Sequence, residues 1–462
     1  MTHKKSARRN HYKKFWKLGK REFNTQLFDI SKEGELTVSE GHYQYNIHEL
    51  AQRYGTPLRI TFPFIIEQRV AHLMETFERA IGEYEYTGQF YYHYPMKVNQ
   101  NRSFVLPLVS EGANLEITSA NELWVVKRMW EQHRFNSRIK VICNGPKTRA
   151  YLDLIAELKE NGLDIIPIIE DMHEREALKN FRGQVGVRVD LGVRVDSRWD
   201  KRINRFGLTI DELMSIGKIR NLTVLHYHAG SEIDRINDLV RPLRKAVEIY
   251  AKLKDTHPSL DTIDIGGGFS VNYTGKKKYR LQTAVERIVG TIEKVCSERG
   301  IQHPNIICEW GSHIAAPAQM TIFRVLAEKQ IPKATAKKWY VVVGSFQAHL
   351  LDTWAIHRQW HVVPVNQLHS KKLSRVWLAG MSCDSDDKYT AGGSYMLLPR
   401  LEDLANDEDQ YIAVLDTGSY QNAFTHHHCL NATPTHLVCH DGDVKVVRKR
   451  ETPEEVGKLF GW

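Results

Sequence analysis

The sequence contains no run of 18 or more apolar residues, although hydrophobic residues make up 42% of its 462 positions. A membrane-spanning helix needs about 20 such residues in succession, so we expect none. No apolar segment opens the chain, and we expect no secretory signal. The six cysteines are scattered and form no Cys-x-x-Cys pair, which favours a reduced, cytoplasmic protein over a disulfide or zinc framework.

Acidic residues are absent from the first 21 positions, which hold nine lysines and arginines. The whole chain has a net charge of +9 (64 basic minus 55 acidic residues), so the chain without this segment is formally neutral. We therefore expect residues 1–25 to form a basic tail that is solvated and partly disordered. Such a tail could touch nucleic acid, an acidic membrane or an acidic partner, whereas the neutral body gives no reason to expect either of the first two.

Strand-like and helix-like patterns alternate through the middle of the chain. Besides 58–60, the expected strands are 89–93, 114–118, 139–143, 164–168, 186–189, 222–226, 262–265 and 305–309. Apolar residues with helical spacing lie between them, for example at 120–130, 149–161, 239–254 and 280–299. This alternation implies parallel strands in roughly eight βα units, which predicts a TIM-like (β/α)8 barrel over 58–325. A doubly wound open sheet is the alternative.

Beyond about residue 325 the strand patterns mostly lack intervening helices. They occur at 321–327, 339–344, 376–379, 411–416, 434–439 and 444–449. This predicts a separate β domain over 326–462, and the short strand patterns near 28–38 suggest that 26–57 joins it. The expected fold class is therefore α/β plus β.

Polar residues and glycines follow several of the expected barrel strands. Lys97 comes just after the aromatic pattern 89–93, and a glycine triplet, 266–268, follows the pattern 262–265. Barrel enzymes place their active sites at this end of the strands. Each residue also has an ordinary explanation, because most lysines are solvated surface groups and a glycine triplet can be a flexible turn.

Four features near the expected strand ends together meet the requirements of pyridoxal phosphate: a lysine, a glycine loop, a histidine and a glutamate. Lys97 could bind the cofactor aldehyde covalently, and Gly266–Gly268 with Ser231 could anchor the phosphate. His228 could lie over the ring, although a buried core histidine is the commoner case. Glu309 could keep the ring nitrogen protonated, although a protein Arg or Lys would serve equally well as its partner.

The expected β domain contains two further runs of polar residues. In Cys383–Asp387 a cysteine stands among acids, so its thiol should stay protonated and act as an acid, while the carboxylates could hold a cationic substrate. An acidic turn would have the same composition. The run His426–Cys429 looks like a metal cluster, but adjacent residues seldom converge on one ion, and we expect no metal.

Taken together, the motifs resemble those of the fold type III (alanine-racemase-like) pyridoxal-phosphate decarboxylases, and most of all the biosynthetic arginine decarboxylases. The resemblance extends from about residue 28 to 435 in the family's order. The matching segments are Tyr94–Gln100, Leu115–Glu116, Ser119–Leu123, Ile142–Gly145, His226–Ser231, Asp264–Gly268, Glu309–Gly311, Asp352–Ile356, Cys383–Asp386 and Gly418–Gln421.

The resemblance implies a role for each residue of the site. Cofactor binding is implied for Lys97, Glu116, Arg188, His228, Ser231, Gly266, Gly267, Gly268, Glu309, Gly311 and Tyr420. Substrate binding is implied for Asp352, Asp384 and Asp386. The implied catalytic residues are Lys97, His228 and Cys383, where Cys383 returns a proton to the α-carbon after CO2 leaves. Because the family forms head-to-tail homodimers, Cys383 and Asp384 are implied to act in the other subunit's site.

The chain departs from the family pattern in two places. Ser312 stands where the family usually has an arginine that contacts the phosphate, which leaves the phosphate site with one charge fewer. The chain also has no room for the helical insertion that typical biosynthetic arginine decarboxylases carry between barrel and β domain. Because that insertion affects assembly, we expect a simple dimer.

The implied activity is decarboxylation of a basic L-amino acid, with L-arginine as the expected substrate and agmatine as the product. Ornithine, lysine, carboxynorspermidine and diaminopimelate are alternatives, since relatives act on them. A racemase would need a tyrosine base opposite the lysine, and Cys383 argues against it. A cofactor-binding regulator without activity is the alternative of another class, for which Ser312 and the basic tail are the motivating features.

Overall fold

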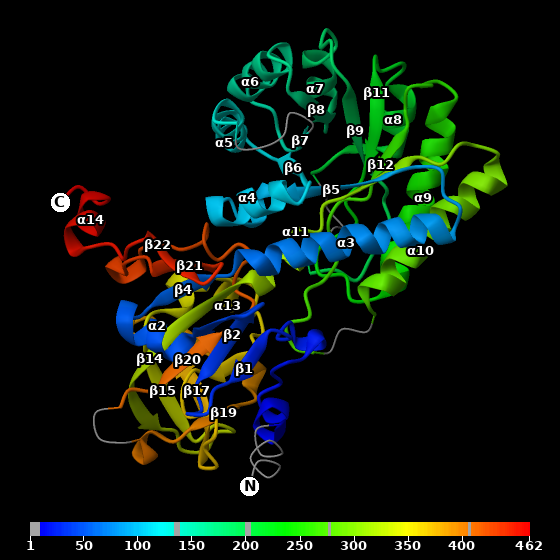
Figure 1. The fold of residues 1–462 in the computed structure, drawn as a ribbon. Coiled ribbons are helices and arrows are strands. Elements are labelled where there is room, and N and C mark those ends of the chain that lie inside the picture. Colours follow the sequence, from blue (N-terminus) through cyan, green and yellow to red (C-terminus); the bar gives the residue numbers. More distant parts are fainter. Residues whose placement is uncertain (1–9, 134–138, 199–204, 276–278, 405–407) are drawn as a thin grey trace. The chain divides into compact units, whose positions relative to one another are not determined.

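The computed structural model describes residues 10–133, 139–198, 205–275, 279–404 and 408–462. The chain divides into two compact units, and many of their elements are labelled in Figure 1. The barrel unit comprises Ile66–Val271 and Lys277–Ile314. The β unit comprises Met1–Ile65, Asn272–Lys276 and Ala315–Trp462.

Eight parallel strands of the barrel unit form a closed ring. In the order of their pairing they are β9 (Val185–Asp190), β11 (Leu222–His226), β12 (Thr262–Asp264), β13 (Asn305–Cys308), β5 (Phe90–Pro95), β6 (Asn114–Ile117), β7 (Lys140–Cys143) and β8 (Asp164–Ile169). The ring closes because β8 also pairs with β9, in the register Ile168 to Gly186. This closure confirms the predicted (β/α)8 barrel and excludes the open sheet. The short β10 (Leu208–Thr209) pairs with β9 as well.

Helices alternate with these strands. They are α4 (Arg102–Ser110), α5 (Ala120–Glu131), α6 (Arg149–Glu160), α7 (Met172–Ala177), α8 (Ile210–Ser215), α9 (Ile236–Lys254), α10 (Leu281–Arg299) and α11 (Gly311–Ala315), preceded by α3 (Pro63–Glu83). Several start within a few residues of a strand end, where a polar side chain caps them, as Ser119 does for α5 and Asp171 for α7. Among the described residues, no helix is both long and apolar enough to span a membrane.

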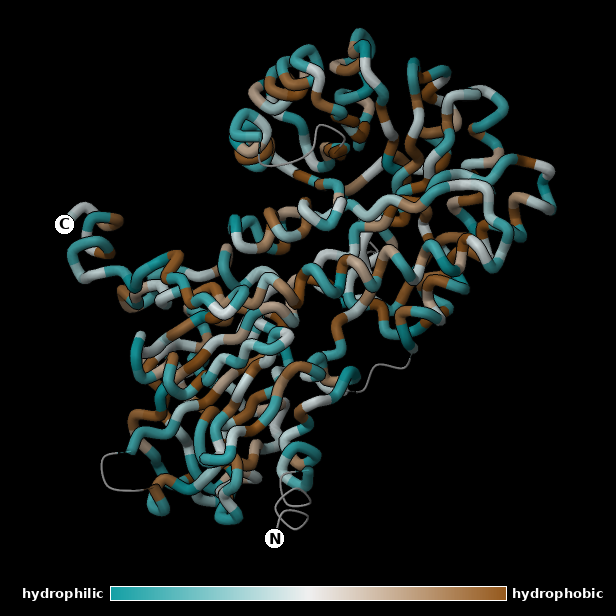
Figure 2. The backbone as a smooth tube through the Cα atoms, in the orientation of Figure 1, coloured by the Kyte–Doolittle hydropathy of each residue, from teal (hydrophilic) through white to brown (hydrophobic). Residues whose placement is uncertain are grey.

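The barrel interior is filled by branched apolar side chains from the strands. A buried cluster joins five of them: Ile142, Ile166, Ile168, Val224 and Ile307. A Cβ on Gly186 would lie 2.3 Å from a methyl group of Ile168, so β9 carries a glycine where the packing leaves no room. In each unit hydrophobic and hydrophilic positions alternate along the backbone, and many outer turns are hydrophilic (Figure 2). This core fixes the strand ends that carry the polar residues.

The β unit is built on a ten-stranded sheet. Its main path runs β18 (Lys388–Tyr389), β17 (Leu373–Ala379), β15 (Lys338–Val343), β14 (Gln319–Gln330), β4 (Leu58–Thr61), β21 (Thr435–His440) and β22 (Asp443–Arg448). Beside this path lie β16 (Val362–Pro364), β19 (Met396–Pro399) and β20 (Tyr411–Val414). A separate sheet holds β1 (Phe28–Ile30), β2 (Leu36–Glu40) and β3 (Tyr43–Asn46). The helices of this unit include α2 (Ile47–Tyr54), α12 (Phe346–His349), α13 (Asp352–Ala355) and α14 (Pro453–Lys458).

The boundary between the units differs from the expected division at residues 58 and 325. The strand β4 does not enter the barrel, because it pairs with β14 in an antiparallel and with β21 in a parallel arrangement. The first residues of β14 also belong to the β unit, which resumes at Ala315. A strand pattern shows that a strand forms but not which sheet it joins, since pairing depends on distant partners.

The described part of the expected basic tail is anchored by two apolar side chains, while most of its lysines and arginines are exposed. Trp16 is 5% exposed, and its indole N–H donates to the carbonyl oxygen of Leu368 at 2.9 Å. Leu18 is also buried, and Lys13 forms an ion pair with Asp29 at 3.2 Å. The expectation of a free arm is therefore wrong for residues 10–25, because two apolar side chains anchor them to the β unit. Residues 1–9 lie outside the described residues.

Candidate active site

The barrel unit gathers its polar residues at the C-terminal ends of the strands. Lys97 lies in the 3-10 turn Met96–Val98, which directly follows β5. Glu116 is part of β6, and Asn144 and Glu309 come directly after β7 and β13. Because β13, β5, β6 and β7 are consecutive neighbours in the ring, these four side chains lie side by side.

Lys97 is held by a buried carboxylate. Its Nζ lies 2.7 Å from Oε2 of Glu116, whose side chain is fully buried, whereas the Lys97 side chain is 39% exposed. An ammonium group at the edge of a buried carboxylate is fixed in direction but can still be reached by a small molecule. This is the arrangement that a lysine needs in order to bind an aldehyde at a defined place.

Asn144 links the lysine side of the cluster to Glu309. Its Nδ2 donates to Glu116 Oε1 and to Glu309 Oε1, each at 2.8 Å. One amide therefore bridges two buried carboxylates and keeps both in place. Sequence reasoning did not single out Asn144 as a site residue, although its position directly after an expected strand was a signal that could have found it.

Burial shifts the pKa values of three titratable groups at this end of the barrel, Glu309, Asp264 and His226. Desolvation raises the pKa of Glu309, and the charges of Asp264 and Glu116 raise it further. Desolvation also raises the pKa of Asp264, while it lowers the pKa of His226 to about 4. His226 Nδ1 lies 3.0 Å from Asp264 Oδ2. Since burial penalises charge, the cluster holds a carboxyl group that would ionise readily if a cationic donor entered.

The glycine triplet packs tightly against the loop that follows β11. Gly266 and Gly268 have φ values of +64° and +113°, which favour glycine. A Cβ on Gly268 would lie 2.6 Å from the carbonyl oxygen of Gly230, and one on Gly267 would lie 3.1 Å from His228 Nε2. The three residues thus form a cradle that any side chain would fill, with His228 beside it.

Arg188 contacts an acid that the sequence reasoning also overlooked. Its Nη1 lies 3.2 Å from Oε2 of Glu170, the residue that directly follows β8. Burial alone would raise the pKa of Glu170, but the Arg188 guanidinium and the N–H of Gly145 outweigh it, and the pKa is lowered. The guanidinium also lies 4.6 Å from the ring centroid of Phe206. Arg188 is therefore a fixed positive group at the barrel end.

The remaining barrel candidates lie in the loops after β11 and β13. Ser231 accepts the N–H of Arg198 at its carbonyl oxygen, 2.9 Å away, and Ile233 then forms a parallel bridge to Phe269. Gly311 begins α11, where a Cβ would lie 2.6 Å from Pro95. Ser312 follows as the second residue of this five-residue helix.

These residues fit pyridoxal phosphate. The buried Glu309 carboxyl suits a protonated ring nitrogen, because a cationic donor would offset the desolvation and the neighbouring negative charge that raise its pKa. The cradle of Gly266–Gly268 leaves backbone close to the surface where a phosphate would bind. Lys97 could supply the amine, since Glu116 holds its ammonium group in place. Each chemical requirement of the cofactor is thus met by a residue of the barrel unit.

In the β unit, Cys383 and its acidic neighbours occupy the loop between β17 and β18. Asp387 is buried, and its Oδ1 accepts the backbone N–H groups of Phe346 and Gln347 at the start of α12, at 2.6 and 3.2 Å. Asp384 lies 3.4 Å from the His428 ring, and a backbone hydrogen bond from Asp386 lowers its pKa. Asp387 therefore shapes the loop, while Asp384 is left near its surface.

Asp352 is neutralised within the β unit. Its Oδ2 lies 2.9 Å from Nε of Arg358, and both side chains are buried. The guanidinium is also 4.3 Å from the ring centroid of Tyr273 and 5.7 Å from that of Trp360. Asp352 therefore does not present an isolated negative charge. The sequence reasoning missed Arg358, which lies six residues further along the chain.

Tyr420 and the histidine run complete the sequence candidates. Tyr420 has a φ of +65° and stacks on Phe424 with ring centroids 5.7 Å apart. In the run His426–Cys429, His427 pairs with Glu451 at 2.9 Å. Two groups of three potential metal ligands occur among the described residues, and neither includes this run: Glu40, His440 and Asp441, and His226, Asp264 and Glu309.

Comparison with known proteins identifies the family. Residues 68–316, more than half of the chain, match the family described as pyridoxal-dependent decarboxylase, pyridoxal binding domain. The chain belongs to this family of pyridoxal-dependent decarboxylases. The matched region corresponds to the barrel unit, which agrees with the fit of the cofactor to the barrel residues.

Individual relatives agree in fold and extend the likeness to the β unit. The biosynthetic arginine decarboxylase of Bacteroides thetaiotaomicron is 28% identical over 346 residues, which cover 67% of this chain and 54% of that protein. This chain thus spans about half the length of the curated relatives it matches. The crystal structure of the Campylobacter jejuni biosynthetic arginine decarboxylase gives a TM-score of 0.81 at 20% identity, covering 96% of this chain and 90% of that one. Diaminopimelate decarboxylase of M. jannaschii with L-lysine gives 0.79 at 20%, covering 94% and 97%.

Proposed function

We propose that this decarboxylase acts on a basic L-amino acid, with L-arginine as the substrate and agmatine and CO2 as the products. The observation that supports it is the continuous row Lys97, Glu116, Asn144 and Glu309, in which contacts of 2.7 to 2.8 Å join an amine to two buried carboxylates. A row of this kind provides for both ends of the cofactor ring, the aldehyde and the nitrogen.

Different barrel residues would bind different parts of pyridoxal phosphate. Lys97 would bind its aldehyde, Glu309 would accept the N–H of the ring, and His228 would lie against the ring face. Gly266–Gly268 and Ser231 would receive the phosphate. When bound, the protonated ring supplies an electron sink for the pair left behind as CO2 departs. Glu309 would serve that chemistry by ionising when the protonated ring nitrogen lies beside it.

We further propose that the protein is a homodimer in which each site is completed by the partner subunit. Cys383 of the partner subunit would give a proton from its Sγ to the α-carbon, and the partner's Asp384 would bind the cationic end of the substrate. The exposed position of both residues on their loop supports a role outside their own unit. All six cysteines are free thiols, which supports the expected cytoplasmic compartment.

The choice of arginine rests on the names of the curated relatives and on the acids of the Cys383 loop. A guanidinium favours carboxylates that can accept two hydrogen bonds. Asp384 is the better candidate for this contact than Asp352, since Asp352 is already paired with Arg358. Asp386 is exposed and lies 3.6 Å from Lys388, so its part in substrate binding remains the weaker proposal.

CO2 release from a panel of basic amino acids tests the substrate. We expect release from L-arginine to exceed that from ornithine, lysine and diaminopimelate, and Asp384→Asn to raise KM more than it lowers kcat. No release from arginine would refute this choice of substrate.

The visible absorbance of the purified protein tests the lysine. We expect Lys97→Ala to lose the band of the lysine-bound cofactor, while the control Lys140→Ala, in β7, keeps it. A band that persists in Lys97→Ala would refute the assignment.

A second candidate is a cofactor-binding regulator without activity. Ser312 is the observation that favours it, because the phosphate site would lack the arginine of the family pattern. The two candidates differ in a simple way: the regulator would bind the cofactor but release no CO2 from any amino acid. The variant Ser312→Arg restores the positive charge. Its cofactor affinity, compared with that of the wild type, would show how far the serine lowers this affinity.

A further inference from the structure

Two of the six cysteines differ from the others in exposure. Cys383 and Cys429 are exposed, whereas Cys143, Cys296, Cys308 and Cys439 are buried. The exposed pair also lies together: the two Sγ atoms are 3.9 Å apart and share a hydrogen bond. Reactive thiols are accessible ones, so this pair is the part of the chain that an oxidant would reach first.

A second contact joins the two loops that carry these cysteines. Cys383 lies between β17 and β18, and Cys429 lies in the 3-10 turn His428–Leu430, 46 residues further along. His428 Nε2 is 3.4 Å from Oδ2 of Asp384, so the neighbour of each cysteine pairs with the neighbour of the other. Two adjacent contacts between the same loops keep the thiols facing each other.

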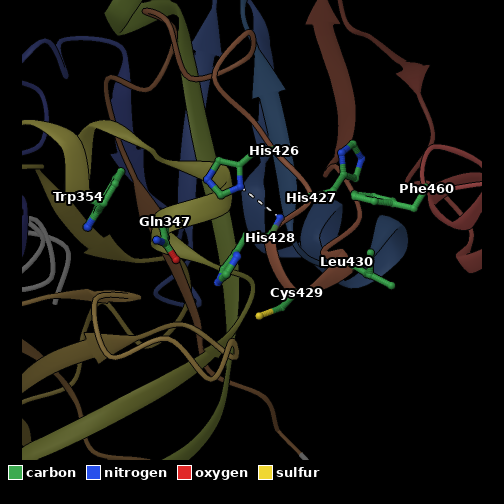
Figure 3. A pocket seen from close by; sticks show the side chains of 8 residues that line it. All are labelled: Gln347, Trp354, His426, His427, His428, Cys429, Leu430 and Phe460. Atoms are coloured by element: carbon green, nitrogen blue, oxygen red, sulfur yellow. Dashed lines mark hydrogen bonds between the residues drawn. The ribbon is translucent and has the colours of Figure 1, made fainter.

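The backbone at Cys429 is held in an unusual conformation. Cys429 and Leu430 have φ values of +53° and +54°, in the left-handed region that branched and bulky residues rarely adopt. The turn also forms part of an open pocket of about 610 Å3, together with Gln347 and Trp354 (Figure 3). The thiol is thus presented by a fixed turn at a place that small solutes can enter.

The surroundings of Cys429 disfavour ionisation of its thiol. Desolvation and the hydrogen bond with Cys383 raise the pKa of the Cys429 thiol. Because the thiolate is the reactive form of cysteine, this raised pKa makes Cys429 the less suitable first nucleophile, which leaves Cys383 as the first sulfur of the pair to react. A metal is not the better explanation, because neither cysteine belongs to a group of three potential ligands among the described residues.

We propose that Cys383 and Cys429 are a site of reversible oxidation that forms an intrachain disulfide in response to peroxides. Cys383 loses its thiol proton to solvent as its sulfur attacks one peroxide oxygen; the O–O bond breaks, a sulfenic acid and hydroxide form, and the released proton converts the hydroxide to water. The Cys429 sulfur then attacks the Cys383 sulfur, the S–O bond breaks, and the oxygen leaves as water. Two thiols and one peroxide thus give one disulfide and two waters, and a dithiol reverses the step.

The disulfide would switch the proposed activity off. Its formation needs only the thiol pair, whereas the loss of activity rests on the proposed function, in which Cys383 supplies the proton. A disulfide sulfur has no proton to give, so the oxidised enzyme would stop at that step. Cys429 acts here as a protecting residue, because it captures the sulfenic acid before further oxidation makes the damage permanent.

Treatment of the purified holoenzyme with hydrogen peroxide tests the proposal. We expect two thiols per chain to disappear, a peptide containing Cys383 to become linked to one containing Cys429, and denaturing non-reducing gels to show single chains. Activity should fall at least tenfold and return with dithiothreitol. An unlinked pair of peptides, or chains linked to one another, would overturn the proposal.

The variant Cys429→Ser separates the disulfide from simple oxidation. It should keep the basal activity but lose it irreversibly in peroxide, because Cys383 then passes on to the sulfinic acid. Cys296→Ser, which changes a buried thiol, should behave like the wild type. Recovery of Cys429→Ser as complete as that of the wild type would refute the role of Cys429. If no variant releases CO2 before oxidation, the proposed function fails, while the linked peptide still decides the disulfide.

Discussion

Replacing Glu309 with glutamine should remove much of the pH dependence that the carboxylate cluster gives to the stability of the cofactor-free barrel. The folded structure raises the pKa of this buried carboxyl to about 8, from an ordinary value of 4.5, through desolvation first and neighbouring charge second. Between these values the group is protonated in the folded protein and ionised in the unfolded chain. Folding therefore takes up a proton, and stability falls as the pH rises.

The size of the effect follows from the proton count. One proton taken up on folding lowers the free energy of unfolding by about 1.4 kcal/mol for each pH unit. From pH 5 to pH 7 the loss is about 2–3 kcal/mol, which corresponds to about 5–10 °C in the unfolding midpoint of a domain of this size. Glu309→Gln stays neutral throughout, so its advantage over the wild type should grow from near zero at pH 5 to this value at pH 7.

Scanning calorimetry of the cofactor-free protein at several pH values measures this difference. The control is Glu298→Gln, which changes an exposed glutamate of α10 and should follow the wild type. Adding pyridoxal phosphate at pH 7 should reverse the order, since an ionised Glu309 can then accept the ring N–H. A difference between wild type and Glu309→Gln that stays constant from pH 5 to pH 7 would contradict the reasoning.

Three further substitutions test other contacts. Asn144→Leu should weaken cofactor binding about tenfold in a fluorescence titration, because the bridge between two buried carboxylates is lost; unchanged affinity would contradict this. Arg358→Gln should lower the free energy of unfolding by about 3–5 kcal/mol in urea, since Asp352 stays buried without its cation, and adding Asp352→Asn should restore most of it. Gly268→Ala should reduce cofactor affinity more than Gly112→Ala, which has a φ of +81° but open space around it; equal effects would show that backbone strain alone matters.

Local patterns were enough to predict most of the elements. The strand patterns 114–118, 164–168 and 222–226 became β6, β8 and β11 within a residue or so, because apolar side chains in a buried parallel strand form a continuous run. The site residues that follow such strands could be named for the same reason.

What local patterns could not provide was the pairing between distant segments. The strand β4 looked like the first barrel strand and joined the β unit, because only its partners β14 and β21 decide its sheet. Likewise, the expected free tail is anchored through Trp16, whose hydrogen-bond partner Leu368 lies 352 residues away. The local sequence of β4 and of the tail gives no indication of these distant partners.

The sequence by itself determined that a barrel forms and which residues stand at its strand ends, since both depend on spacing within short segments. The tertiary structure alone decided which of these residues touch. Asn144 bridges Glu116 and Glu309, Arg358 neutralises Asp352, and the Cys383 loop meets Cys429, because folding brings separate loops to within hydrogen-bond distance. Charge and reactivity depend on such neighbours, so the chemistry of these groups could be read only once the chain was folded.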